Sequence, residues 1–225
     1  MTEQITALVT GANRGLGRQF ATELVSRGAK VYAAARRPES IDIPGVVPIQ
    51  LDITDPESVR AAAAVANDVT VLVNNAGVST GADLLTGSMD DIRLEMETHY
   101  FGTLSVVREF VPVIEKNGGG SILDVLSVLS WYHAPAFGPY SAAKAASWAM
   151  TDALRTELAP KGIHVAALHV GFMDTDMASD VPAEQKISPA VVAKQAIDGL
   201  LGGQAEILAD DLSRHVKAGL ATANS

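Results

Sequence analysis

Short apolar segments alternate with longer amphipathic segments along almost the whole chain. The apolar segments are rich in Val, Ile, Leu and Ala, which is typical of strands buried on both faces of a parallel sheet. They lie at residues 5–9, 30–35, 46–51, 69–73, 121–126, 163–169 and 206–208. The segments between them repeat apolar residues at helical spacing, which predicts helices at residues 17–26, 56–66, 90–116, 140–158 and 189–201.

This alternation predicts an α/β fold in which a doubly wound, parallel, seven-stranded sheet lies between two layers of helices. The chain has 225 residues, the length of one such domain, which we expect to include residues 1–225. Residues 210–225 are interpreted as a C-terminal tail with Leu212, Val216 and Leu220 at helical spacing.

Composition and charge exclude several classes of function. The chain has no cysteine, so we expect no disulfide, no thiolate metal site and no cysteine nucleophile, and we predict no bound metal. The net charge of −9 argues against a nucleic-acid partner, because no basic face can be assembled. The start, Met-Thr-Glu-Gln, resembles no leader sequence, and no apolar stretch has the length of a membrane span, so we expect a cytoplasmic protein.

A glycine-rich turn follows the first apolar segment. Residues Thr10 to Gly17 read Thr-Gly-Ala-Asn-Arg-Gly-Leu-Gly and lead directly into a predicted helix. Glycines in such a turn let the backbone approach a pyrophosphate, and the helix N-terminus supplies unpaired N–H groups and a partial positive charge. A glycine-rich loop alone is weak evidence, but its place between a strand and a helix favours nucleotide binding.

The end of the second apolar segment indicates which nucleotide is bound. It reads Ala35-Arg36-Arg37, where an acidic residue would hold the 2′-hydroxyl of an NAD ribose. An arginine accommodates the 2′-phosphate of NADP instead, and Arg14 can face the same phosphate. We therefore expect NADP(H), with NAD(H) as the alternative, although ordinary surface arginines would also explain the pattern.

Tyr140 and Lys144 are the candidate catalytic pair. They are four residues apart near the start of an Ala-rich helix, so their side chains share one face. An ammonium beside a phenol favours the phenolate, so we expect the pKa of Tyr140 to fall from about 10. Such a tyrosine can give a proton to a carbonyl oxygen or take one from an alcohol. Ser127 follows the strand predicted at 121–126, at the edge where ligands bind, and can steady the same oxygen.

A packed tyrosine and a solvated lysine would explain this pair without catalysis. The order of the other motifs along the chain therefore decides between a catalytic pair and two unrelated residues. Together the motifs resemble those of the short-chain dehydrogenase/reductase family, over essentially the whole chain. The matching residues are Thr10-Gly-x-x-x-Gly-x-Gly17, Asp52, Asn74-Asn-Ala-Gly77, Ser127, Tyr140-x-x-x-Lys144, and Gly171 with Thr175. The resemblance implies a Rossmann-like fold and an NADPH-dependent carbonyl reductase that also acts as an alcohol dehydrogenase.

The resemblance also implies a role for each residue of the site. Tyr140 protonates the carbonyl oxygen, Ser127 orients it, and Lys144 binds the nicotinamide ribose and lowers the pKa of Tyr140. The cofactor is expected to contact Gly11, Asn13, Arg14, Gly15, Leu16, Gly17, Arg36, Asp52, Ile53, Asn75, Ala76, Gly77, Tyr140, Lys144, Gly171, Phe172, Met173 and Thr175.

Two residues depart from the family pattern. The family usually has an Asn that holds a water beside the catalytic lysine, and His99 stands at that place. A neutral imidazole has one donor and one acceptor, so His99 can complete the proton path, pack without a role, or slow turnover. A positive charge near Lys144 is disfavoured, so we expect His99 to be neutral at pH 7. Val170 replaces the proline that usually precedes Gly171, which predicts a looser loop.

The substrate is less closely determined than the chemistry. The aromatic and Met side chains expected around the nicotinamide suggest an apolar ketone or secondary alcohol, aromatic ones included. They are Trp131, Tyr132, His133, Phe137, Phe172, Met173 and Met177. The alternative function is a cofactor-binding regulator or scaffold with little turnover, which only His99 favours. The spacing of Tyr140 and Lys144 favours carbonyl reduction over epimerisation or enoyl reduction.

The helix predicted after Tyr140 is apolar nearly all round. Its Ala residues, with Trp148, Met150 and Leu154, leave few positions for solvent, so one face must be buried beyond its own sheet. We therefore expect a homodimer or homotetramer that associates through helices 90–116 and 140–158. A tolerant Ala-rich surface is the simpler alternative.

Overall fold

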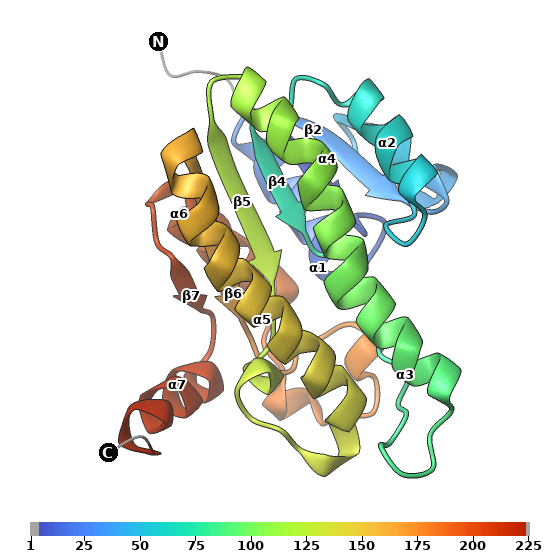
Figure 1. The fold of residues 1–225 in the computed structure, drawn as a ribbon, viewed down its shortest axis with the longest axis vertical. Helices are drawn as coiled ribbons and strands as arrows, with labels where there is room; N and C mark the ends of the chain where they lie inside the picture. Colours follow the sequence, from blue (N-terminus) through green and yellow to red (C-terminus); the bar gives the residue numbers. More distant parts are fainter. Residues whose placement is uncertain (1–4, 224–225) are drawn as a thin grey trace.

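Seven parallel strands form one sheet in the computed structural model, which describes residues 5–223 (Figure 1). The strands are β1 (Thr6–Thr10), β2 (Lys30–Ala35), β3 (Val46–Gln50), β4 (Val71–Asn74), β5 (Gly120–Val125), β6 (Ile163–His169) and β7 (Glu206–Leu208). Their order is β3-β2-β1-β4-β5-β6-β7, so the direction of winding reverses between β1 and β4. Ligands of such sheets bind at the carboxyl ends of the strands beside this reversal. The predicted doubly wound sheet is confirmed.

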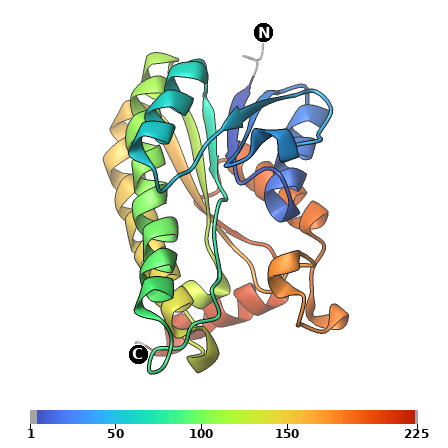
Figure 2. The same ribbon diagram turned by 90° about the vertical axis from the view of Figure 1, so that its right-hand side faces the viewer.

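Helices cover both faces of the sheet and complete the three predicted layers (Figure 2). One layer consists of α1 (Gly15–Ser26) and α6 (Pro189–Leu201), and the other of α2 (Pro56–Val65), α4 (Thr103–Lys116) and α5 (Gly138–Leu158). Each face has its own buried hydrophobic cluster, with Phe20 in one and Phe110 in the other. Within residues 5–223, no helix combines the length and the apolar character needed to cross a bilayer.

The remaining elements are one helix beyond the sheet, one at the C-terminus and several short turns. The helices are α3 (Met89–Met96) and α7 (Asp211–Ala223). The 3₁₀ turns are Pro38–Ser40, Val128–Ser130, Pro135–Phe137, Ala159–Lys161, Asp176–Ala178 and Ala183–Gln185. The segment interpreted as a tail is therefore helical from Asp211 to Ala223, and its last two residues lie outside the described part of the chain.

The helix predicted at residues 90–116 has a different winding in its middle. A π-helical segment, Glu97–Gly102, separates α3 from α4 and contains His99. The hydroxyl of Ser147 on α5 donates to the His99 carbonyl at 3.0 Å and so ties the two helices together. Single π-helical turns inside α-helices occur frequently at functional sites, and sequence periodicity does not reveal them.

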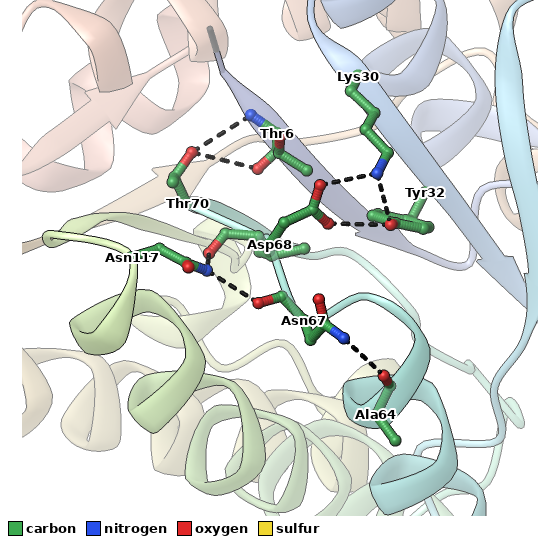
Figure 3. A network of polar contacts seen from close by, with 9 residues as sticks. Thr6, Lys30, Tyr32, Ala64, Asn67, Asp68, Thr70 and Asn117 are labelled. Carbon is green, nitrogen blue, oxygen red and sulfur yellow. Dashed lines mark hydrogen bonds and ion pairs between the residues drawn. The ribbon is translucent and has the colours of Figure 1, made fainter. Parts of the chain in front are cut away.

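A polar network locks the amino-terminal edge of the sheet, opposite the ligand-binding edge (Figure 3). The Lys30 ammonium contacts the Asp68 carboxylate and the Tyr32 hydroxyl, each at 2.7 Å. The same hydroxyl donates to the other oxygen of Asp68 at 2.9 Å. Nearby, the Asn117 amide donates to the carbonyls of Asn67 and Val69 at 3.1 Å. These contacts hold the starts of the strands together at the edge opposite the ligand-binding loops.

The glycine turn between β1 and α1 is held from below by Thr10 and Asn75. The Thr10 hydroxyl accepts hydrogen bonds from the backbone N–H groups of Asn75 and Ala76, at 2.9 and 3.0 Å. The Asn75 amide donates to the carbonyls of Thr10 and Gly11 at 2.9 and 3.3 Å. Gly17 is required here because any Cβ would overlap the Gly11 carbonyl and the Asn75 amide.

Replacing the buried Thr10 by the isosteric valine tests this support. Thr10→Val leaves two partly buried backbone N–H groups without an acceptor, so we expect the free energy of unfolding to fall by about 1–3 kcal/mol. Urea unfolding followed by circular dichroism measures the loss. Thr10→Ser keeps the hydroxyl and is the control, and equal stability of the Ser and Val variants would contradict the assignment.

Candidate active site

Helix α5 brings Tyr140 and Lys144 to the carboxyl end of β5. The Lys144 ammonium donates to the Val125 carbonyl, the last residue of β5, at 2.8 Å. Its nitrogen lies 5.6 Å from the centroid of the Tyr140 ring, over the ring and not bonded to the phenol oxygen. Lys144 is only 5% exposed. The helical spacing therefore places the pair on one face as predicted, but the contact is cation–π in character.

The pKa of Tyr140 differs in direction from the sequence-based expectation. Burial raises the pKa of the phenol above its usual value, and the Glu95 carboxylate raises it further. The expected lowering by Lys144 was wrong for this arrangement, since desolvation and the Glu95 carboxylate both disfavour the phenolate. Burial also lowers the pKa of Lys144 to about 8, against a smaller opposing effect of Asp124. Tyr140 is consequently protonated at neutral pH and suited to donate a proton.

His99 lies at the edge of Tyr140. The two ring centroids are 5.1 Å apart in an edge-to-face arrangement. The Nε2 atom of His99 lies 2.7 Å from the Val78 carbonyl oxygen and 3.4 Å from the Val78 nitrogen, and the shorter contact favours the tautomer with its proton on Nε2 and a lone pair on Nδ1. Burial lowers the pKa of His99 to about 3, and the charge of Lys144 adds to the effect. The expected neutral state of His99 is therefore confirmed.

A small internal cavity joins His99 to Lys144. It has a volume of about 10 Å³, and Asn74, Asp124 and Ser147 also line it. That volume is about the size of one water molecule, and the lining offers several polar partners. Gly77 permits this arrangement, because a Cβ there would overlap the His99 ring.

Asp124 is a buried acid of this site that the sequence analysis missed. Its two carboxylate oxygens accept hydrogen bonds from the Asn74 amide at 2.8 Å and from the Thr151 hydroxyl at 2.7 Å. The side chain is 2% exposed, and burial raises its pKa. The available signal was an acidic residue inside the otherwise apolar run 121–126, because a buried carboxyl requires partners.

Ser127 begins the 3₁₀ turn that follows β5. Its hydroxyl accepts from the Leu129 N–H at 3.1 Å and lies 3.5 Å from the Val170 carbonyl oxygen, while its own N–H faces the Ser130 hydroxyl. The residue is 7% exposed. These contacts make Ser127 an N-cap whose side chain is fixed by backbone groups of two loops. Its place at the ligand-binding edge agrees with the prediction.

The two arginines expected at the nucleotide phosphate have different surroundings. Arg14 pairs with Asp176 at 3.2 Å, and both side chains are largely exposed. Arg36 is exposed and has no hydrogen bond or ion pair within residues 5–223. Asp52, expected to contact the cofactor, already uses one carboxylate oxygen to accept hydrogen bonds from the N–H and the hydroxyl of Thr54. Arg36 is therefore the more available of the two cations.

The loop after β6 is held more firmly than the loss of proline predicted. The N–H of Gly171 donates to the Asp210 carboxylate at 2.5 Å. The other oxygen of Asp210 accepts from the N–H of Ser213 at 2.7 Å, at the start of α7. Farther along the loop, Thr175 lies against the glycine turn, 3.4 Å from where a Cβ on Gly15 would be. Asp210 was also missed, and its place before a helix, typical of an N-cap, was the available signal.

The aromatic residues expected around the substrate divide into two groups. Trp131 is 7% exposed and stacks on His169 with centroids 3.7 Å apart, so it belongs to the interior. Phe137 and Phe172 lie near each other at the ligand-binding edge, with centroids 6.3 Å apart. These two rings are half-buried, whereas Tyr132, His133 and Met177 are exposed. Met173 packs against the hydrophobic core, like Trp131 on the interior side. The apolar surface near the site is thus smaller than the sequence suggested.

Comparison with known proteins gives consistent matches. The family model described as short chain dehydrogenase matches residues 5–186. A short chain dehydrogenase from Burkholderia cenocepacia, solved in complex with NADP, is 40% identical with a TM-score of 0.93, and the match covers 97% of this chain and 93% of that one.

Two curated relatives have similar sequences. The dehydrogenase/reductase SDR family protein 7-like of Drosophila melanogaster is 29% identical over 93% of this chain and 73% of its own length. The 3-oxoacyl-(acyl-carrier-protein) reductase of Salmonella typhimurium is 32% identical over 89% of this chain and 85% of its own length. This chain spans about two thirds of the length of some other curated relatives.

We expect His99 to stay neutral, with its proton on Nε2, from about pH 9 to about pH 5. The imidazole nitrogen shifts measured by NMR should therefore keep the values of that tautomer. The unfolded chain binds a proton near pH 6.5 that folded His99 does not, so the free energy of unfolding should fall as the pH drops below that value. His99→Asn should reduce this dependence. A cationic His99 signal above pH 5 would contradict the assignment.

Proposed function

This chain belongs to the short-chain dehydrogenase/reductase family and is an NAD(P)-dependent oxidoreductase that acts on CH–OH and C=O groups. Within that family, we propose that it is an NADPH-dependent carbonyl reductase. The observation that carries the proposal is the half-buried, protonated phenol of Tyr140 beside the Lys144 ammonium at the ligand-binding edge. The substrate class we propose is an apolar ketone, aromatic ketones included, with the secondary alcohol as the reverse substrate.

The residues around the glycine turn fit a dinucleotide. The N-terminus of α1 has no side-chain cap, so its first N–H groups are available to a pyrophosphate. Gly17 keeps the turn free of side chains, and exposed Arg36 can pair with a 2′-phosphate. The 40% identical Burkholderia protein was solved with NADP, which supports the same choice here. When bound, the reduced nicotinamide supplies a hydride to the carbonyl carbon.

Tyr140 supplies the proton in the proposed reaction. Its phenol donates to the carbonyl oxygen of the substrate as negative charge develops there, and the Lys144 ammonium stabilises the phenolate that results. Ser127 orients the same oxygen, provided that its hydroxyl turns from the Val170 carbonyl towards the substrate. The small polar cavity beside Lys144 can hold one water between it and Nδ1 of His99, which gives the proton a route back.

Apolar side chains support the proposed substrate class. Phe137 and Phe172 border the edge where Tyr140 lies, and the exposed Met177 lies on the loop that follows. A carboxylate substrate is disfavoured, because the buried carboxyl groups of Glu95 and Asp124 lie close to the catalytic pair.

We also propose that the chain is a homodimer or homotetramer. Leu94 and Phe101, on α3 and the π-helical segment, are 44% and 53% exposed. Large apolar side chains on neighbouring helical turns favour burial against another copy, which agrees with the expected association through these helices and α5.

Replacing Tyr140 by phenylalanine tests its role as the acid. Tyr140→Phe removes the proton donor, so we expect turnover of ketones to fall by about 10²–10⁴-fold while the dissociation constant of NADPH stays nearly unchanged. NADPH oxidation over a panel of aryl and alkyl ketones measures the first and fluorescence titration the second. Tyr32→Phe, at the opposite edge of the sheet, is the matched control. Turnover of the Tyr140 variant within a few-fold of the parent would rule the phenol out.

Cofactor choice depends on Arg36 in this proposal. A guanidinium binds a 2′-phosphate through two charge-assisted hydrogen bonds, so Arg36→Ala should raise the apparent constant for NADPH much more than that for NADH. Steady-state kinetics with both cofactors measures the change. Arg37→Ala is the control, since Arg37 is also exposed. If the parent enzyme prefers NADH, the assignment of this strand end is wrong.

Two variants separate the proposed relay role of His99 from packing. Asparagine keeps a donor and an acceptor, so His99→Asn should retain most of the turnover, whereas His99→Leu should lose much of it. The pH dependence of kcat for both variants is the measurement. Full activity of the Leu variant from about pH 5 to about pH 9 would leave His99 with a packing role alone.

A further inference from the structure

We propose that the C-terminal helix α7 is part of the active-site scaffold, and that through Lys217 and Trp131 it holds His169 as a positioning residue of Ser127. The inference rests on the proposed function, in which Ser127 orients the carbonyl oxygen of the substrate, because it names the residues that hold Ser127 in position. In Figure 2, α7 lies beside the turn that follows β5, and this contact joins the end of the chain to the site.

The contact between His169 and Ser127 is the first link. His169 is the last residue of β6 and is fully buried. Its Nδ1 atom lies 3.3 Å from the Ser127 carbonyl oxygen, so that nitrogen carries the ring proton and donates it. The N–H of Ser130 donates to the same oxygen at 3.0 Å. Two donors on one carbonyl fix the peptide after Ser127 and thereby the direction of its side chain.

Trp131 is the second link. Its indole stacks on the His169 ring at an angle of 20°, with centroids 3.7 Å apart. Trp148 on α5 contacts Trp131 edge to face at 5.9 Å, so the indole is confined from a second side. Trp131 is the residue directly after the 3₁₀ turn Val128–Ser130, and Ser127 is the residue directly before it. Fixing Trp131 therefore also restricts the backbone of the turn that leads from Ser127.

Lys217 on α7 is the third link. Its ammonium lies 4.6 Å from the centroid of Trp131 and 5.8 Å from that of Trp148, a cation between two indoles. Glu206 on β7 pairs with the same ammonium at 2.7 Å and holds it in place. An ammonium on an indole face is attracted by the ring quadrupole, more strongly where water is excluded.

Asp210, directly before α7, provides an independent second tie. One carboxylate oxygen caps α7 through the N–H of Ser213, and the other accepts from the N–H of Gly171. The start of α7 therefore holds the loop after β6, while Lys217, farther along the helix, holds the turn after β5. Both loops border the catalytic residues, so a shift of α7 moves both.

The test compares Lys217→Met with Lys217→Arg and with Lys161→Met. Methionine keeps the length of the side chain but removes the cation, whereas arginine retains it. Lys161 is the matched control, because it also pairs with a glutamate, Glu115 at 2.9 Å, but at the opposite edge of the sheet. Thermal unfolding confirms that each variant is folded before it is compared.

Three readouts follow the linkage. Both tryptophans of the chain face Lys217, so intrinsic fluorescence reports the cage directly. We expect Lys217→Met to change the emission, to speed amide hydrogen exchange at residues 127–131, and to lower kcat about 10-fold or more with an unchanged NADPH dissociation constant. Lys217→Arg should restore all three, and Lys161→Met should change none. Unchanged exchange at 127–131 in Lys217→Met, or kcat within twofold of the parent, would overturn the inference.

Two variants of His169 separate positioning from packing. His169→Phe keeps the stack on Trp131 but removes the donor, so kcat should fall as in Lys217→Met while the fluorescence change is small. His169→Asn can place an amide N–H near the position of Nδ1 and should recover most of kcat. Turnover of the Phe variant within twofold of the parent would overturn the role of His169. A parent enzyme that reduces no ketone would refute the proposed function instead, while the exchange and fluorescence measurements would still test the linkage.

Discussion

The structure depends on keeping one ammonium, that of Lys144, in a place that water hardly reaches. Burial alone would expel the charge, and it lowers the pKa to about 8. Three groups oppose this effect. The Val125 carbonyl at the end of β5 accepts a hydrogen bond from the ammonium, and the face of the Tyr140 ring lies against it. The Asp124 carboxyl on β5 raises the pKa of Lys144 through its charge. These favourable contacts come from β5 and α5, so the packing of these two elements at the ligand-binding edge is what allows a buried positive charge there.

A second Tyr–Lys pair shows how much the surroundings matter. Lys30 and Tyr32 are bonded directly and share Asp68 at the solvated amino-terminal edge, where the contacts serve to hold strands together. Tyr140 and Lys144 have no such carboxylate between them, and the phenol remains protonated because burial raises its pKa. The same two residue types thus give a structural clamp at one edge and, in the proposed reaction, a proton donor beside a cation at the other.

The sequence was sufficient for the sheet, the glycine turn and the place of Ser127, because these follow from local patterns and the strand-end rule. It was insufficient for the π-helical segment at His99, since a wider helical turn leaves no mark on apolar spacing. The direction of the Tyr140 pKa was also missed, because it depends on how deeply the phenol is buried among elements distant in sequence. Trp131 was misplaced for the same reason, since only the fold reveals that His169 lies beneath it.

The C-terminal helix shows how loops at the ligand-binding edge can be held in place by contacts from outside the sheet. A site for a ketone needs loops that are free of the sheet ladder, and such loops are mobile unless something outside the sheet holds them. Asp210 and Lys217 hold two of these loops. The Asp210 carboxylate accepts a hydrogen bond from the N–H of Gly171 in the loop after β6, and the Lys217 ammonium lies on the indole of Trp131 in the loop after β5. These interactions fix the backbone on either side of the site, so the Ser127 hydroxyl needs only to turn from the Val170 carbonyl to reach a substrate. Limiting the reorganisation to one side chain is what preorganisation of a catalytic group requires.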